Sequence, residues 1–164
     1  MSPDPTEGLR IRRAARAVVL DPDERILLVR FEFPAGTRWA LPGGGIDPGE
    51  DAPGALRREL REETGLVDAD IGPHVWTRLH VIPFLDGQWD GQHETIHVVR
   101  CNAFEPAPHF TAEELAAEHV HELRWWTLDE IAAALVTFVP ATLADRLTEL
   151  LRDGPPNPPV DVGV

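Results

Sequence analysis

One stretch of 23 residues, from Gly44 to Leu66, constrains the fold of this chain more than any other feature. It opens within a run of three glycines, which is typical of a tight backbone turn. Residues 51–64 then have the pattern of a helix, with Asp51 suited to the N-cap and Gly65 to the C-terminal stop. Apolar residues at every fourth position give this helix one narrow buried face. The sequence therefore predicts a glycine turn followed by an amphipathic helix.

Three glutamates, Glu59, Glu62 and Glu63, stand at positions i, i+3 and i+4 of that helix. This spacing places the carboxylates on one face, with Cβ atoms about 5–6 Å apart, and Arg58 and Arg61 flank the face. In a partly enclosed groove each pair of like charges repels by roughly 3 kcal/mol, which a divalent cation removes. Carboxylate oxygens suit Mg²⁺ or Mn²⁺. A solvated acidic face is the alternative, but it does not account for the glycine turn.

Glu50 lies directly before the helix, and Arg58 lies two turns into it. This placement predicts an ion pair between the two side chains that fixes the loop to the helix. The role of such a pair is structural, without direct chemistry.

These residues together resemble the box that defines the Nudix hydrolases, at every defined position. The matching residues are Gly44, Glu50 and the run Arg58-Glu59-Leu60-Arg61-Glu62-Glu63-Thr64-Gly65-Leu66. The wider resemblance covers roughly residues 14–152. It implies an α/β fold, namely a Nudix-type α/β/α sandwich with a central mixed β-sheet and a loop–helix–loop catalytic motif.

The resemblance also implies roles for individual residues. Glu59, Glu62, Glu63 and the backbone carbonyl of Gly43 would bind Mg²⁺, with Mn²⁺ as the alternative. Water would attack a phosphorus atom of the substrate diphosphate while the metal neutralises charge.

Glu62 or Glu63 would take the proton from the attacking water. A glutamate of a late loop is the other candidate for this role, and Glu118 is the first choice there, with alternatives at Glu113, Glu114 and Glu122. Arg30 resembles a family position that contacts the substrate phosphate, although a surface strand arginine is an equal alternative.

The rest of the chain predicts one domain over residues 11–153, with a flexible N-terminus over 1–10 and a flexible proline-rich tail over 154–164. Strands and helices are mixed without the regular alternation of a doubly wound sheet. The expected strands are 11–20, 25–33, 39–41, 73–85, 93–105 and 122–126, and the expected helices after the box are 128–135 and one that begins near Pro140 and ends near Asp153. Thr111 and Glu114 predict one capped helical turn within an acidic connection over 106–120.

Composition excludes several classes of function. The net charge of −13 argues against binding a nucleic-acid polymer. All fifteen basic residues are arginine, which excludes Schiff-base chemistry and a Walker-type phosphate loop, since both need lysine. No apolar run approaches a membrane span, and one cysteine allows no intrachain disulfide. We therefore expect a cytoplasmic protein that acts on a small nucleotide or nucleoside diphosphate derivative, with a homodimer left open.

The substrate class is predicted less sharply. The compact single domain resembles the nucleoside-triphosphate-cleaving branch of the family. The chain has no tyrosine, so the tyrosine that marks dinucleoside polyphosphate hydrolases is absent. An ADP-ribose or ADP-sugar pyrophosphatase and a non-catalytic nucleotide-binding module are the alternatives. Against the last, every acidic position of the box is intact.

Overall fold

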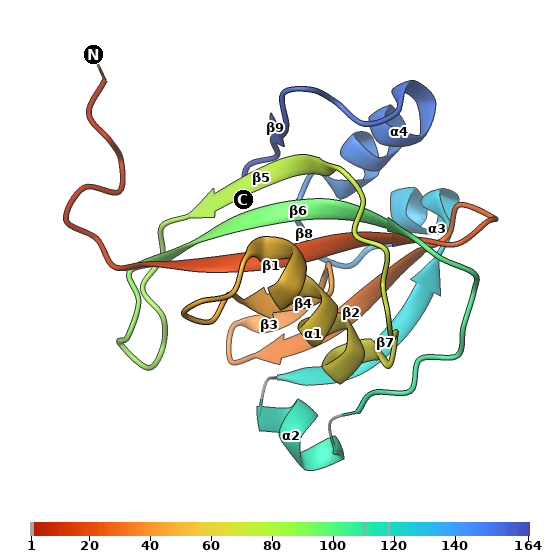
Figure 1. Cartoon of the computed structure of the whole chain (residues 1–164), viewed down its shortest axis with the longest axis horizontal. Helices are drawn as coiled ribbons and strands as arrows, with labels where there is room; N and C mark the ends of the chain where they lie inside the picture. Colours follow the sequence, from red (N-terminus) through yellow and green to blue (C-terminus); the bar gives the residue numbers. More distant parts are fainter. Residues whose placement is uncertain (1, 110, 118) are drawn as a thin grey trace.

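A computed structural model describes residues 2–109, 111–117 and 119–164, and it contains a mixed β-sheet flanked by helices (Figure 1). The strand order is β8-β3-β2-β1-β6-β5-β9, with β4 paired to β1 and β7 paired to β2. The strands are β1 (Ile11–Leu20), β2 (Ile26–Phe33), β3 (Gly36–Ala40), β4 (Gly43–Gly45), β5 (His74–His80), β6 (Gly91–Arg100), β7 (Val120–Trp126), β8 (Phe138–Val139) and β9 (Val160–Asp161). The helices are α1 (Ala52–Thr64), α2 (Ala112–Ala117), α3 (Leu128–Ala133) and α4 (Leu143–Asp153).

The sheet divides between its two central strands. β1 and β2 pair at Leu20 and Ile26. Beyond that point β1 pairs with β4, and β2 pairs with β7 along almost its whole length. On its other edge β1 runs parallel to β6. The division brings β4, and with it the glycine run, next to β1.

Two apolar layers cover the two faces of the sheet. Successive residues of a strand point to opposite faces, and β1 follows this rule, since Val18 and Leu20 belong to one buried cluster and Ala17 and Val19 to the other. The first cluster includes Ile131 of α3 with Leu143, Leu147 and Leu150 of α4, and the second includes Leu56 and Leu60 of α1. The predicted α/β/α sandwich is therefore confirmed. Within the described part of the chain, no helix has both the length and the apolarity to cross a bilayer.

Most predicted elements are present, but several differ in extent, and the short strands β8 and β9 were not predicted. The glycine run forms the short strand β4 rather than a bare turn. The hairpin strands are shorter than expected, because β5 ends at His80 rather than near 85 and β6, which begins at Gly91, ends at Arg100 rather than near 105. Pro83 lies in the segment between them and has no N–H to donate to a sheet ladder.

The predicted flexible tail is wrong at its end. β9 pairs in parallel with β5, and Val162 is buried in the cluster below α4. The physical reason is that β5 presents a free edge, and the alternating valines at 160 and 162 supply an apolar face for it.

Candidate active site

The glycine run packs tightly on both of its sides. At Gly43, where φ is +138°, an added Cβ would lie 2.1 Å from the carbonyl oxygen of Ala15 on β1. At Gly44 an added Cβ would lie 2.6 Å from the carboxyl carbon of Glu59 on α1. Glycine at both positions therefore lets the backbone of β4 lie between β1 and the glutamate face of α1.

Helix α1 begins and ends as its sequence predicts. The Asp51 side chain accepts a hydrogen bond from the N–H of Gly54 at 2.8 Å. Gly65 ends the helix in the left-handed conformation, with φ of 83°. Leu56 and Leu60 are fully buried against the sheet, which fixes the rotation of the helix and so decides where its glutamates lie.

The three box glutamates differ in their surroundings. Glu63 is 5% exposed and accepts a hydrogen bond from the N–H of Gly43 at 3.3 Å. The side chain of Glu59 is 15% exposed, and its burial raises the pKa of the carboxyl group, although Arg58 opposes the shift. Glu62 is the most open of the three, with 23% of its side chain exposed.

Arg58 links the loop, the helix and the acidic face. Its guanidinium group donates to both oxygens of Glu50, at 2.9 and 2.8 Å, so the predicted ion pair is present. It also donates to the carbonyl of Gly45 at 3.0 Å. These contacts lower the pKa of Glu50 to about 2, with a backbone hydrogen bond from Asp47 adding to the effect.

Arg58 differs from expectation in one respect. The helical spacing predicts that it flanks the acidic face, but its Nη1 lies 2.9 Å from Glu59 and 3.4 Å from Glu62. Its long side chain bends back over the face that holds the carboxylates. The guanidinium therefore compensates their charge.

The donor set fits a hard divalent cation. It consists of three carboxylates and the carbonyl oxygen of Gly43, all oxygen ligands of the kind that Mg²⁺ prefers. Cations already contact these oxygens, since Arg58 contacts Glu59 at 2.9 Å and Arg16 donates to the Gly43 carbonyl at 2.9 Å. In the described part of the chain no three acidic, histidine or cysteine side chains converge as a ready metal site. A metal ion would therefore take over contacts that the two arginines now make.

Arg30 and the late-loop acids lie along β2, β7 and α2. Arg30 is paired with two carboxylates, Glu32 at 3.2 Å and Glu122 at 3.3 Å. Glu113 and Glu114 are exposed on α2, where Glu114 and Thr111 form the predicted capping contacts. Glu118, the first candidate of this loop, lies outside the described residues. The structure thus gives Arg30 an acidic environment from which its guanidinium would have to turn toward a phosphate.

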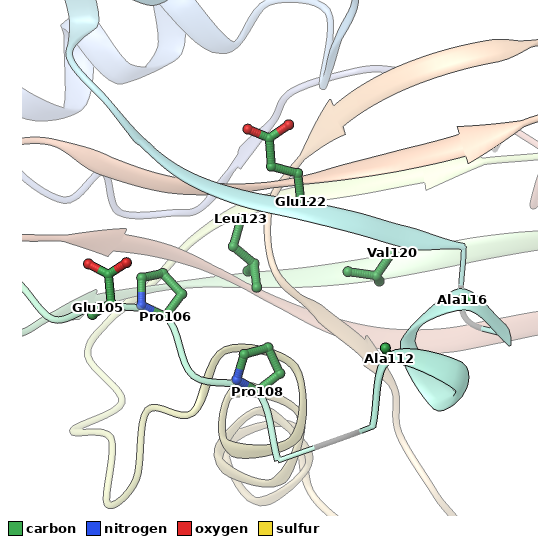
Figure 2. Close-up of a pocket in the computed structure, with 8 residues that line it drawn as sticks. All are labelled: Glu105, Pro106, Pro108, Ala112, Ala116, Val120, Glu122 and Leu123. Carbon is green, nitrogen blue, oxygen red and sulfur yellow. The ribbon is translucent and has the colours of Figure 1, made fainter.

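A cavity of about 440 Å³ lies between β7, α2 and the segment that precedes α2 (Figure 2). Figure 2 shows the carboxylate of Glu122 on the opposite side of β7 from Leu123 and the two prolines. None of the box glutamates lines this cavity. Its lining is mostly apolar and consists of Glu105, Pro106, Pro108, Ala112, Ala116, Val120, Glu122 and Leu123. It is therefore separate from the acidic face of α1.

Buried polar residues that sequence reasoning missed lie on β5 and β6, beside Arg16 of β1. Arg78 and Glu94 are each 5% exposed, and Gln92 is 8% exposed. A signal was available, because Gln92 and Glu94 occupy alternate positions of a strand whose next alternate residues, Ile96 and Val98, are buried and apolar. Charged side chains at such positions need partners from elsewhere in the fold.

Comparison with known proteins agrees with this architecture. The NUDIX domain family matches residues 10–147 of the chain. Nudix hydrolase 25 of Arabidopsis thaliana is 29% identical over 132 residues, which are 74% of this chain and 75% of that protein. Nucleoside triphosphatase NudI of Salmonella typhimurium is 45% identical over 72 residues, which are 43% of this chain and about half, 48%, of that protein.

Solved structures share the fold. The NUDIX domain of Shewanella oneidensis NrtR, complexed with ADP ribose, has a TM-score of 0.65 at 21% identity, covering 92% of this chain and 94% of that one. The E. coli ORF135 protein has a TM-score of 0.61 at 21% identity, covering 94% and 99%. Because the family match spans most of the chain and includes the box, the chain belongs to the NUDIX domain family and is a Nudix-type pyrophosphohydrolase.

Proposed function

We propose that this protein hydrolyses the diphosphate linkage of nucleoside triphosphates in a Mg²⁺-dependent reaction. One observation carries the proposal: an all-oxygen acidic face on α1, packed against the carbonyl-bearing turn at Gly43. The nucleoside triphosphatase name of the Salmonella relative, which is similar over 72 residues, favours this substrate class over ADP-ribose or ADP-sugars. We also expect the protein to be cytoplasmic, with a homodimer left open.

Glu59, Glu62, Glu63 and the carbonyl of Gly43 would hold the metal, with Mn²⁺ as an alternative to Mg²⁺. A bound ion would supply charge neutralisation at the diphosphate and would make the attacking water easier to deprotonate. Of the two box residues considered as proton acceptor, Glu62 is the more exposed, whereas Glu63 is engaged with the N–H of Gly43. Glu62 is therefore better placed to take the proton, and Glu118 is the alternative from the late loop.

Arg30 is proposed to contact a substrate phosphate. The side chain of Arg30 is 32% exposed and lies between Glu32 at 3.2 Å and Glu122 at 3.3 Å. Exposed ion pairs of this kind cost little to exchange for a phosphate partner.

Glu63→Gln tests the metal assignment, since it removes the charge and keeps the shape. We expect kcat for a nucleoside triphosphate to fall by at least roughly 10²-fold, the range for losing a catalytic carboxylate. The melting temperature of the wild type should rise in MgCl₂ relative to NaCl of equal ionic strength, because an ion that binds only the folded state stabilises it. The rise should be lost in Glu63→Gln and kept in Glu149→Gln, an exposed glutamate of α4.

The substrate panel consists of nucleoside triphosphates, ADP-ribose, NADH and dinucleoside polyphosphates, each assayed with Mg²⁺. Preferred cleavage of ADP-ribose would move the assignment to the alternative substrate class. Full turnover by Glu63→Gln would contradict its metal role. If no compound is cleaved while nucleotides still raise the melting temperature, the chain is a binding module.

A further inference from the structure

A cluster of buried polar side chains converges on one oxygen of Glu94. Gln92 Nε2 donates to Glu94 Oε1 at 2.8 Å. Arg16 Nε and Arg78 Nη1 each lie 3.4 Å from the same oxygen. We call these four residues, from β1, β5 and β6, the Glu94 cluster. All four residues lie outside the Nudix box, which spans Gly44 to Leu66.

The Glu94 cluster holds two guanidinium groups and one carboxylate. Because Gln92 donates to Glu94, its amide oxygen is free to accept, and it does so from Arg12 Nη1 at 3.1 Å. Arg12 thus reaches the cluster through Gln92, while Arg16 and Arg78 share the single carboxylate of Glu94. Arg78 Nε is buried and has no hydrogen-bond acceptor within the described residues.

A purely structural ion pair would not have this composition. Buried charges are tolerated when they are matched by partners and every donor is satisfied. Here burial lowers the pKa of Arg78, and the nearby Glu94 only partly opposes this. Two guanidiniums on one carboxylate and the buried Nε of Arg78, without an acceptor in the described part of the chain, both suit a further anion.

The Glu94 cluster adjoins the acidic face of α1 through the backbone of Gly43. The carbonyl of Gly43 accepts from Arg16 Nη1 at 2.9 Å, and its N–H donates to Glu63 at 3.3 Å. One residue therefore joins a group of carboxylates that suits a cation to a group of guanidiniums that suits an anion. A substrate with several phosphates would suit both groups. One phosphate would bind the metal held by the carboxylates, and another would remain for the arginines.

We infer that Arg16 and Arg78 bind a second phosphate group of the substrate, one that the metal does not hold. Glu94 and Gln92 are positioning residues that orient the two guanidiniums. The inference deepens the proposed function and rests on it. It also predicts a preference for substrates with an additional anionic group beyond the hydrolysed linkage.

Gln92→Glu is the principal test, because it nearly preserves shape and adds a negative charge between Arg12 and Glu94. Gln88→Glu, the same substitution at an exposed position of the β5–β6 loop, is the matched control. Inorganic phosphate is titrated calorimetrically in EDTA, so that no metal contributes. We expect Gln92→Glu to weaken phosphate binding by roughly tenfold or more and Gln88→Glu to leave it unchanged.

Steady-state kinetics with Mg²⁺ give a second measurement. Arg78→Gln and Gln92→Glu should raise KM for a nucleoside triphosphate by roughly tenfold while kcat stays within about threefold. Arg152→Gln, at an exposed arginine of α4, is the control for loss of one arginine. If Arg78→Gln lowers the melting temperature because a buried charge is lost, the KM of Gln92→Glu is the measurement that tests the inference.

The outcomes separate this inference from the proposed function. Equal phosphate affinity in Gln92→Glu and the wild type, or no phosphate binding by the wild type at millimolar concentration, overturns the inference and leaves the hydrolase proposal standing. Phosphate binding that depends on Gln92, in a protein that cleaves no compound of the panel, supports the anion site and overturns the proposed function.

Discussion

At the scale of single residues, the site depends on two glycines with different constraints. Gly43 combines a left-handed φ with contact to the backbone of β1, so a side chain there would displace the strand. At Gly44 the three atoms nearest to an added Cβ all belong to the carboxylate group of Glu59. Glycine at position 43 is therefore needed for the packing of the fold, whereas glycine at position 44 is needed for the position of the Glu59 carboxylate.

Gly44→Ala should damage turnover more than stability. The methyl group would displace the carboxylate of Glu59, the flexible end of a side chain, and a misplacement of about 1 Å in a catalytic group costs on the order of 10²-fold in rate. Gly49→Ala is the control, because Gly49 lies in the same loop with φ of 85° and nothing within 4 Å of an added Cβ. We expect Gly49→Ala to lower the melting temperature slightly and keep the rate, and unimpaired turnover in Gly44→Ala would contradict the placement of Glu59.

At the scale of elements, the loop before α1 is fastened to the helix by the Glu50–Arg58 pair. Two hydrogen bonds join the side chains, and Arg58 also donates to the carbonyl of Gly45, so one guanidinium holds the start of the loop and its end. Helix α1 is thus positioned by its buried leucines on one face and by this pair on another. The glycine turn and the glutamates keep their relative places because both are attached to the same side chain.

The pair makes stability depend on acid in a defined window. The pKa of Glu50 falls from an ordinary 4.5 to about 2 on folding. A lowered pKa means that the unfolded chain binds the proton first, so the contribution is complete above pH 4.5 and is lost as pH falls toward 2. We expect the difference in melting temperature between the wild type and Glu50→Gln to be largest at pH 6 and to shrink steadily from pH 4.5 to pH 2.5. A difference that stays constant over this range would show that Glu50 acts by shape alone, and Glu149→Gln serves as the surface control.

At the scale of the whole molecule, the C-terminal segment completes the sheet. β9 covers the edge of β5, and the N–H of Val162 donates to the carbonyl of Thr77 at 2.9 Å. Thr142, at the start of α4, donates to the carbonyl of Val162 at 3.1 Å. The last residues therefore join the sheet edge to the helix layer below it, and the free edge that would invite pairing with another chain is closed.

Val162→Ala should lower the free energy of unfolding by roughly 2 kcal/mol, from the loss of two buried carbons and the cavity that remains. Val164→Ala is the matched control, since Val164 is 59% exposed. Urea unfolding of the two variants measures the difference, with an unchanged m-value expected for both. Equal stability of the variants would indicate that the segment is not packed in solution.

Local sequence alone decided the helix α1, its two caps, the Glu50–Arg58 pair and the capped start of α2. Each depends on residues within eight positions of one another, where helical spacing and turn chemistry dictate the geometry. The box itself is of this kind, which is why the family could be recognised before any coordinates.

Tertiary structure decided the rest. Arg12 and Gln92 are 80 residues apart in sequence and meet because β1 runs parallel to β6, and the pairing of β9 with β5 is equally non-local. The position of Arg58 over the acidic face depends on rotamers chosen in a crowded groove, which helical spacing does not specify. Periodicity shows that a side chain is buried, but which partners it meets follows from the order and register of strands, and those emerge only when the whole sheet is assembled.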